Sequence, residues 1–114
     1  MATETIFISL VSGTTELHLT DNEGHSGDGN LTTDVSPGDT VIWKISAGAN
    51  ISSISSIYKK VSSQDIFSTD PSEQNSGFWK GTVSDSATGK ETYGIKYMID
   101  GKEYDCDPVL QVKI

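Results

Sequence analysis

The feature of this sequence that most limits its fold is a set of short runs in which apolar and polar residues alternate. The two clearest runs are Thr40–Ile45 and Thr92–Ile99, where every second residue is a large apolar or aromatic one. Successive side chains of a strand point to opposite faces of its sheet, so a period of two predicts a strand that buries one face. Shorter or less regular runs predict further strands over residues 5–11, 16–20, 31–35, 51–61, 78–83, 102–104 and 109–114.

Turn signals separate these predicted strands. Ser36–Asp39 (SPGD) suits a type II turn, because proline fixes one φ angle and glycine tolerates the positive φ that follows. Asp100–Gly101 predicts a two-residue hairpin, and residues 85–90 are predicted to form a second hairpin connection. The polar stretches 21–30 and 62–77 are predicted as loops, the second with room for a short helical turn.

The number and shortness of the strands predict the fold class. About eight short strands with turns between them indicate an antiparallel Greek-key β-sandwich of cupredoxin-like or immunoglobulin-like shape. A parallel α/β sheet would need crossover helices, and the sequence offers no helical pattern for them. The length of 114 residues is that of one domain, so a single β-sandwich over residues 1–114 is expected.

Acidic residues dominate the charge of the chain, because 16 acids against 8 bases give a formal net charge of −8. A surface of this sign repels phosphate, which argues against nucleic acids and anionic membranes as partners. The sequence shows neither a signal peptide nor an apolar run of the roughly 18 residues that a spanning helix needs. A cytoplasmic location is therefore expected, and the acidity suits calcium or a basic partner.

Residues 35–43 (VSPGDTVIW) resemble the start of a strand that recurs in cupredoxins, where a loop with the first copper-binding histidine follows. No histidine occurs in residues 44–53 of this chain, and Cys106 is not followed by one. A type 1 copper site needs two imidazoles and a thiolate at one point, whereas His18 and His25 both lie in the N-terminal quarter. The resemblance therefore implies a cupredoxin-like sandwich that lacks copper ligands, and no cofactor is expected.

A second resemblance rests on short motifs spread over residues 29–114. They are Gly29–Leu31, Gly38–Trp43, Ser55–Tyr58, Trp79–Val83, Tyr93–Tyr97 and Asp107–Leu110. These motifs are similar to those of the AidA/PixA inclusion-body family of bacterial proteins. The resemblance implies a small β-sandwich of the bacterial cytoplasm that self-associates or is stored in inclusions, with no established enzymology.

Acidic residues near two turns are the candidate metal ligands. Asp100, Asp105 and Asp107 surround the last predicted hairpin, where they could bind a divalent ion such as calcium or form Asx turns. Turn formation is the favoured interpretation, because each of them lies at the end of a predicted strand. The loop at residues 21–30 matches no calcium-binding template, although it holds four further oxygen donors, Asp21, Glu23, Asp28 and Asn30.

The histidines and the cysteine form no recognisable catalytic set. His18 lies between the inward Leu17 and Leu19 and is expected to point outward, and His25 is a loop residue that is expected to be solvated. Neither has an identifiable base–nucleophile partner, and the acids that flank Cys106 argue against a reactive thiolate. The protein is therefore not expected to be an enzyme.

The predicted function is that of a structural or interaction protein, which self-associates into oligomers or binds another protein. A module that binds calcium, a carbohydrate or another small molecule is the alternative, and a cupredoxin-type metalloprotein is a third hypothesis. An aromatic platform for sugar would require exposed rings. The inward register of the aromatic residues favours the core instead: Trp43, Trp79, Tyr93 and Tyr97.

Overall fold

The computed structural model describes residues 2–46, 48–59, 66–74 and 77–113. Over these residues the chain forms strands joined by turns, and it contains no helix that could cross a membrane. The strands are β1 (Thr3–Leu10), β2 (Leu17–Asp21), β3 (Ser26–Asp28), β4 (Thr32–Val35), β5 (Thr40–Ile45), β6 (Ser53–Lys59), β7 (Phe67–Glu73), β8 (Trp79–Val83), β9 (Lys90–Ile99), β10 (Lys102–Cys106) and β11 (Val109–Val112).

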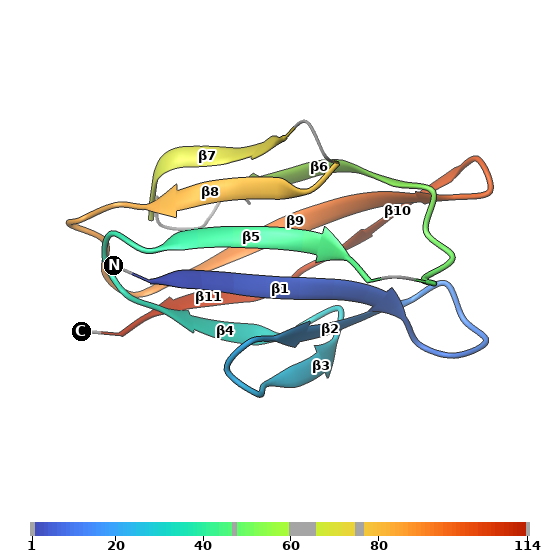
Figure 1. Cartoon of the computed structure of the whole chain (residues 1–114), viewed down its shortest axis with the longest axis horizontal. Helices are drawn as coiled ribbons and strands as arrows, with labels where there is room; N and C mark the ends of the chain where they lie inside the picture. The colour runs from blue at the N-terminus through green and yellow to red at the C-terminus, as the bar shows by residue number, and fades with distance from the viewer. Residues whose placement is uncertain (1, 47, 60–65, 75–76, 114) are drawn as a thin grey trace.

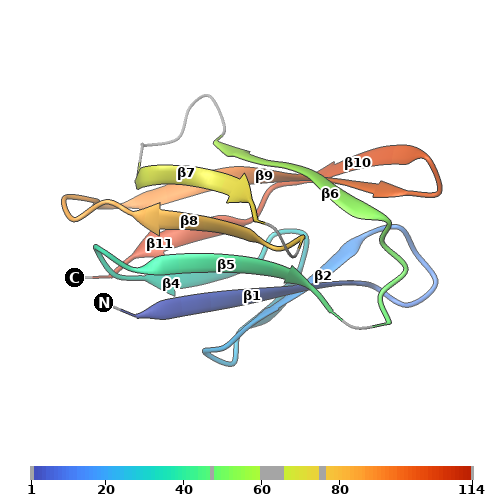
Figure 2. The same ribbon diagram turned by 45° about the horizontal axis from the view of Figure 1, so that its top comes forward.

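These strands lie in two sheets that pack against each other, so the predicted β-sandwich is confirmed (Figures 1 and 2). The six-stranded sheet has the order β3-β2-β1-β5-β8-β7. The second sheet has the order β10-β9-β11-β4, and β6 pairs with β9 as well. Because β6 and β10 pair with the same stretch of β9, they lie on its opposite edges.

Two strand pairs are parallel, which corrects the prediction of a purely antiparallel sandwich. β1 runs parallel to β5, with Ile6 opposite Trp43, and β4 runs parallel to β11, with Val35 opposite Val112. Neither pair needs a crossover helix, because the chain passes through the other sheet between the two partners. Between β1 and β5, for example, it visits the second sheet at β4.

The core fills the space between the two sheets. Its largest fully buried side chains are Trp43 of β5 and Tyr93 of β9. The Trp43 Nε1–H donates a hydrogen bond of 3.0 Å to the Tyr93 hydroxyl, and the two rings meet edge to face. Since β5 and β9 belong to different sheets, this pair joins the two layers. Trp79 and Tyr97 are buried too, so the predicted aromatic core is confirmed.

The predicted irregular strand at residues 51–61 corresponds to β6, and residues 60 and 61 lie outside the described part of the chain. Its register with β9 shifts between Ile54 and Ser56. Because a bulge adds one residue to a strand, Ile54 and Ile57 both face the core although they are three positions apart. The threefold spacing of the isoleucines is therefore the mark of a bulge and not of a helix.

Two predicted loops contain strands, so those two predictions are wrong in part. β3 lies within residues 21–30 and β7 within residues 62–77, of which residues 62–65, 75 and 76 lie outside the described part. Both are edge strands of the six-stranded sheet, and most of their side chains are exposed. A strand that buries no face shows no apolar alternation, and an edge position also tolerates Pro71 in β7.

The predicted turns hold except at one connection. Gly38 has a φ of 85° in the turn at Ser36–Asp39, where the Asp39 N–H donates a hydrogen bond of 3.0 Å to the Ser36 carbonyl. Asp100 and Gly101 join β9 to β10 with φ angles of 49° and 83°, as a two-residue hairpin requires. Residues 85–90 instead lead from β8 in one sheet to β9 in the other.

Candidate functional site

The three predicted calcium ligands lie at two separate places in the structure. Asp100 is in the turn between β9 and β10 and lines a hollow of about 1030 Å³. Asp105 in β10 and Asp107 just after it line a different hollow of about 390 Å³. Asp105 also accepts a hydrogen bond of 2.5 Å from the Tyr58 hydroxyl. The fold thus brings two of the three predicted ligands together and leaves Asp100 apart.

The smaller hollow is acidic, because Glu16 and Asp28 line it together with Asp105 and Asp107. All four of these residues are exposed. The Asp28 carboxylate lies 3.2 Å from the ring of His18, which points away from the core as predicted. Open, solvated carboxylates are common on an acidic protein. Among the described residues, the group of three possible metal ligands within 4.8 Å of one another lies elsewhere, in the turn between β2 and β3.

That group lies where the inward-facing rows of two neighbouring strands end in acids. Glu4 continues the buried row of β1 beyond Ile6, and Asp21 ends the buried row of β2. The two strands are antiparallel neighbours with Ile6 opposite Asp21. The Glu4 carboxyl group lies close enough to that of Glu23 to share a hydrogen bond with it. We call the resulting set the acidic turn cluster; it consists of Glu4, Asp21, Glu23 and His25.

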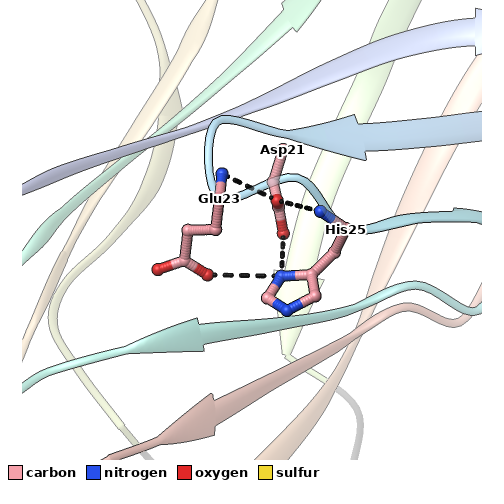
Figure 3. Close-up of side chains that lie close together, drawn as sticks. All are labelled: Asp21, Glu23 and His25. Atoms are coloured by element: carbon pink, nitrogen blue, oxygen red, sulfur yellow. Dashed lines mark hydrogen bonds and ion pairs between the residues drawn. The ribbon is translucent and has the colours of Figure 1, made fainter.

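The buried Asp21 carboxylate is held in place by four hydrogen-bond donors, of which those from Glu23 and His25 are drawn in Figure 3. The backbone N–H groups of Glu23 and His25 each donate a 3.0 Å hydrogen bond to Oδ1. The His25 ring and the Thr33 hydroxyl donate to Oδ2, also at 3.0 Å. Burial alone would raise the pKa of Asp21, but these hydrogen bonds outweigh it and lower the pKa. Asp21 is therefore an ionised carboxylate inside the protein.

His25 is exposed to solvent, as predicted, but its ring is also held by two carboxylates. Its side chain is 43% exposed, yet its Nδ1 atom lies 3.0 Å from Asp21 Oδ2 and 3.4 Å from Glu23 Oε1 (Figure 3). The hydrogen bond and the charge of Asp21 raise the pKa of the imidazole, and Glu23 and Asp34 add to the effect. The ring is thus oriented by two carboxylates and still reaches the solvent.

Glu4 is the buried acid of the cluster whose hydrogen-bonding capacity is not fully used. It is 7% exposed, and its Oε2 atom has no hydrogen-bond partner among the described residues. Burial raises its pKa to about 7, helped by a hydrogen bond with the Glu23 carboxyl group and by the charges of Glu23, Asp39 and Asp21. All of these charged neighbours are acids. Two carboxyl groups in such contact need a shared proton or a cation between them.

The shape of the site favours an ion as its ligand. Hollows of about 1030, 690 and 390 Å³ are present on the molecule, and none of them is lined by the four cluster residues. The cluster itself offers carboxylate oxygens and one imidazole, which are the usual protein ligands of divalent metals. The arrangement can therefore hold a cation.

Sequence reasoning found half of this cluster. It named Asp21 and Glu23 as oxygen donors and grouped them with Asp28, which instead pairs with His18. It missed Glu4 completely. A signal was present, because Glu4 lies two residues before Ile6 and thus continues the inward period of the first strand.

Comparisons with known proteins give a family but no function. A family model described as a domain of unknown function, DUF8788, matches residues 7–105. No curated protein matches the sequence. The resemblance to the AidA/PixA family is not tested by these comparisons and stays a prediction.

Two solved structures show a distant likeness. The endo-fucoidan hydrolase MfFcnA9 from glycoside hydrolase family 107 is 11% identical, and the match covers 75% of this chain and 15% of that one with a TM-score of 0.46. A variant of the endo-fucoidan hydrolase MfFcnA4 from the same family is also 11% identical over 75% of this chain and 13% of its own, with the same TM-score of 0.46. The chain thus spans a small part of either hydrolase, and a likeness this low assigns no function to it.

Proposed function

The chain belongs to the DUF8788 family, a family of domains of unknown function, and we propose that it works as a cation-binding module whose site is the acidic turn cluster. One observation carries the proposal. The Glu4 carboxyl group is buried, its Oε2 atom lacks a hydrogen-bond partner among the described residues, and it faces the carboxyl group of Glu23. Once the Glu4 carboxyl group loses its proton, its buried charge is strongly unfavourable unless it is paired. A cation between the two groups supplies the missing pairing.

The rest of the cluster supports the same function. The Asp21 carboxylate is already ionised and held in place by its hydrogen bonds, so it needs no rearrangement to act as a ligand. Glu23 and His25 lie at the surface and give an ion access from solvent. The alternative of a calcium-binding module, predicted from the sequence for the last hairpin, thus becomes a proposal for the turn between β2 and β3.

A thermal-unfolding titration tests this function. The protein is freed of metal with a chelator and unfolded in the presence of Ca²⁺, Mg²⁺, Mn²⁺ or Zn²⁺, each over a range of concentrations. A ligand that binds only the folded state must raise the melting temperature, by an amount equivalent to about 2.7 kcal/mol at a hundredfold excess over Kd. We expect such a rise with at least one of these ions and its reversal by excess chelator.

Two substitutions locate the effect. Glu4→Gln keeps the shape of the side chain but removes the carboxylate, so it should abolish or strongly reduce the metal-dependent rise. Asp105→Asn alters the acidic hollow instead and should leave the rise unchanged. If none of the four ions raises the melting temperature, or if Asp105→Asn removes the rise and Glu4→Gln does not, the proposed function is wrong.

Self-association, which the AidA/PixA resemblance implies, is a second proposal that one surface feature favours. Phe7 in β1 is the large hydrophobic residue that is exposed among the described ones, at 38%. It lies opposite Thr20 and Lys44 on the neighbouring strands. Sedimentation velocity over a wide concentration range should show association that Phe7→Ser weakens, and a strict monomer at high concentration would contradict the proposal.

A further inference from the structure

We infer that the cation of the acidic turn cluster is a first-row transition-metal ion such as Zn²⁺, bound by His25 Nδ1 together with carboxylate oxygens of Asp21 and Glu23. This inference rests on the proposed function and deepens it, because it names the class of ion. It depends on the spacing of the donor atoms, on the presence of a nitrogen ligand and on the support around the donors.

Two of the three distances between the donor atoms match the spacing of ligands around one ion, and all three atoms lie within 4.8 Å of one another. His25 Nδ1 lies 3.0 Å from Asp21 Oδ2 and 3.4 Å from Glu23 Oε1 (Figure 3). With metal–ligand bonds of about 2.1 Å, neighbouring ligands lie about 3.0 Å apart in an octahedron and about 3.4 Å apart in a tetrahedron. A small ion can therefore take the place of the proton now held between His25 Nδ1 and Asp21, and that proton leaves to solvent.

The nitrogen ligand selects the class of ion. Imidazole suits zinc, copper, iron and nickel, whereas calcium and magnesium take oxygen ligands. In the cluster, Nδ1 of His25 is directed at both carboxylates and not at a backbone carbonyl. A calcium ion in the same place would have a nitrogen ligand that it binds poorly.

The surroundings hold the donors in place for such an ion. Asp21 is oriented by the backbone N–H groups of Glu23 and His25 and by the Thr33 hydroxyl. Partners of this kind fix metal ligands and are worth about 10–100-fold in metal affinity. The buried Glu4 carboxyl group contacts that of Glu23 and has an oxygen without a partner among the described residues, so its negative charge favours a cation at this place.

The test measures metal binding to the full chain without a histidine tag, after removal of metal with a chelator. Isothermal titration calorimetry gives Kd for Zn²⁺ and for Ca²⁺, and Co²⁺ reports its ligands through its visible absorption. We expect Zn²⁺ to bind more tightly than Ca²⁺ and His25→Gln to weaken Zn²⁺ binding at least tenfold. Because the backbone N–H groups and Thr33 still hold Asp21 in that variant, it should fold, and circular dichroism checks this.

Two controls separate this site from adventitious binding. His18→Gln is the matched variant, because His18 is also paired with a carboxylate, that of Asp28, and its side chain is 40% exposed. Cys106→Ser removes the thiol. Both variants should bind Zn²⁺ within about twofold of the wild type, whereas Glu23→Gln should weaken binding as His25→Gln does.

The outcomes distinguish the inference from the proposed function. Zn²⁺ binding that falls in His25→Gln and Glu23→Gln alone supports the inference. Ca²⁺ binding that is tighter than Zn²⁺ binding and unchanged in His25→Gln overturns the inference but leaves a cation-binding module. An equal loss in His18→Gln, or a loss confined to Cys106→Ser, also overturns it. If no cation binds, the inference and the proposed function both fail.

Discussion

Glu4 and Asp21 are the acids that end the inward rows of two paired strands, yet their surroundings move their pKa values in opposite directions. Asp21 stands at the start of a tight turn, where backbone N–H groups are free to point at its carboxylate. Glu4 stands inside a strand, whose N–H groups point sideways to the neighbouring strands. The carboxyl group of Glu4 is therefore buried without backbone N–H groups that donate hydrogen bonds to it. The backbone around each residue decides whether a buried acid is satisfied.

Asp21→Ala should lower the free energy of unfolding at pH 7 by about 3 kcal/mol. The substitution leaves two backbone N–H groups and the buried Thr33 hydroxyl without their acceptor, and each unsatisfied buried donor costs about 1–3 kcal/mol. Asp28→Ala removes an exposed carboxylate that pairs only with the ring of His18 among the described residues and should change stability by less than about 0.5 kcal/mol. Urea unfolding of both variants measures the difference, and equal effects would contradict the role given to Asp21.

The stability of the metal-free protein should fall as the pH rises from about 4.5 to about 7. The pKa of Glu4 is raised from 4.5 to about 7 on folding, so in this range the folded state keeps a proton that the unfolded state has released. The stabilisation is complete below pH 4.5 and is lost as the pH passes the folded pKa. Its upper limit is about 3 kcal/mol, since one pKa unit corresponds to about 1.4 kcal/mol.

Glu4→Gln isolates this effect, because glutamine does not titrate. The raised pKa of His25 also makes stability fall with pH, but only as the pH rises above 6.5, and the lowered pKa of Asp21 acts below pH 3.8. Urea unfolding at several pH values, with chelator present, should show the wild type losing stability relative to Glu4→Gln between pH 4.5 and 7. Parallel pH profiles for the two proteins would refute the assignment.

Single side chains also hold whole strands together, as Tyr58 does in the second sheet. It is opposite Gly94 in the pairing of β6 with β9, and its ring covers the glycine so closely that a Cβ atom there would overlap the ring. Its hydroxyl donates a hydrogen bond to Asp105 of β10, and the Lys96 Nζ atom lies 5.2 Å from the ring centroid. From its place in β6, Tyr58 thus contacts both β9 and β10, and Gly94 leaves room for its ring.

Gly94→Ala should destabilise the protein by about 1–3 kcal/mol, because the added methyl group displaces the Tyr58 ring and breaks its hydrogen bond to Asp105. In a Tyr58→Ala background the same change should be neutral or slightly stabilising, since alanine is better than glycine inside a strand. A double-mutant cycle by urea unfolding measures this coupling. If the effects of the two substitutions on the free energy of unfolding are additive, the packing of the Tyr58 ring does not depend on Gly94.

At the scale of the whole molecule, a net charge of −8 is spread over a small sandwich. Acids gather at the acidic turn cluster and around the 390 Å³ hollow, where Glu16, Asp28, Asp105 and Asp107 lie together. Repulsion between like charges opposes the compact state. Repulsion among all of the acids, and not within one residue pair, therefore lowers the stability of the folded protein.

Raising NaCl from 10 to 300 mM should increase the melting temperature of the chelator-treated protein by a few degrees. Added salt shortens the screening length from about 30 Å to well under 10 Å and so weakens the repulsion among the acids. KCl should act like NaCl, because the effect is one of screening and not of ion binding. A fall in melting temperature, measured by circular dichroism, would show that attractive ion pairs dominate instead.

The alternation of apolar residues was enough to predict the β-sandwich, most of its strands and its aromatic core. This works because the faces of a strand repeat every two residues. The burial of Val41, Trp43 and Tyr93 can therefore be predicted from the residues next to them in the sequence. The turns at Ser36–Asp39 and Asp100–Gly101 were predictable for a similar reason, since proline and glycine act on their own φ angles. The edge strands β3 and β7 escaped prediction because most of their side chains are exposed.

Only the tertiary structure decided which strands pair in parallel and which acids meet. Strand neighbours such as β1 and β5 are set by where the chain changes sheets, which no local pattern records. The meeting of Glu4 with Asp21 and Glu23 depends on the register between β1 and β2, and a shift of one residue would turn Glu4 to the opposite face. Local periodicity thus predicts burial, whereas the contacts that make a site arise from long-range pairing.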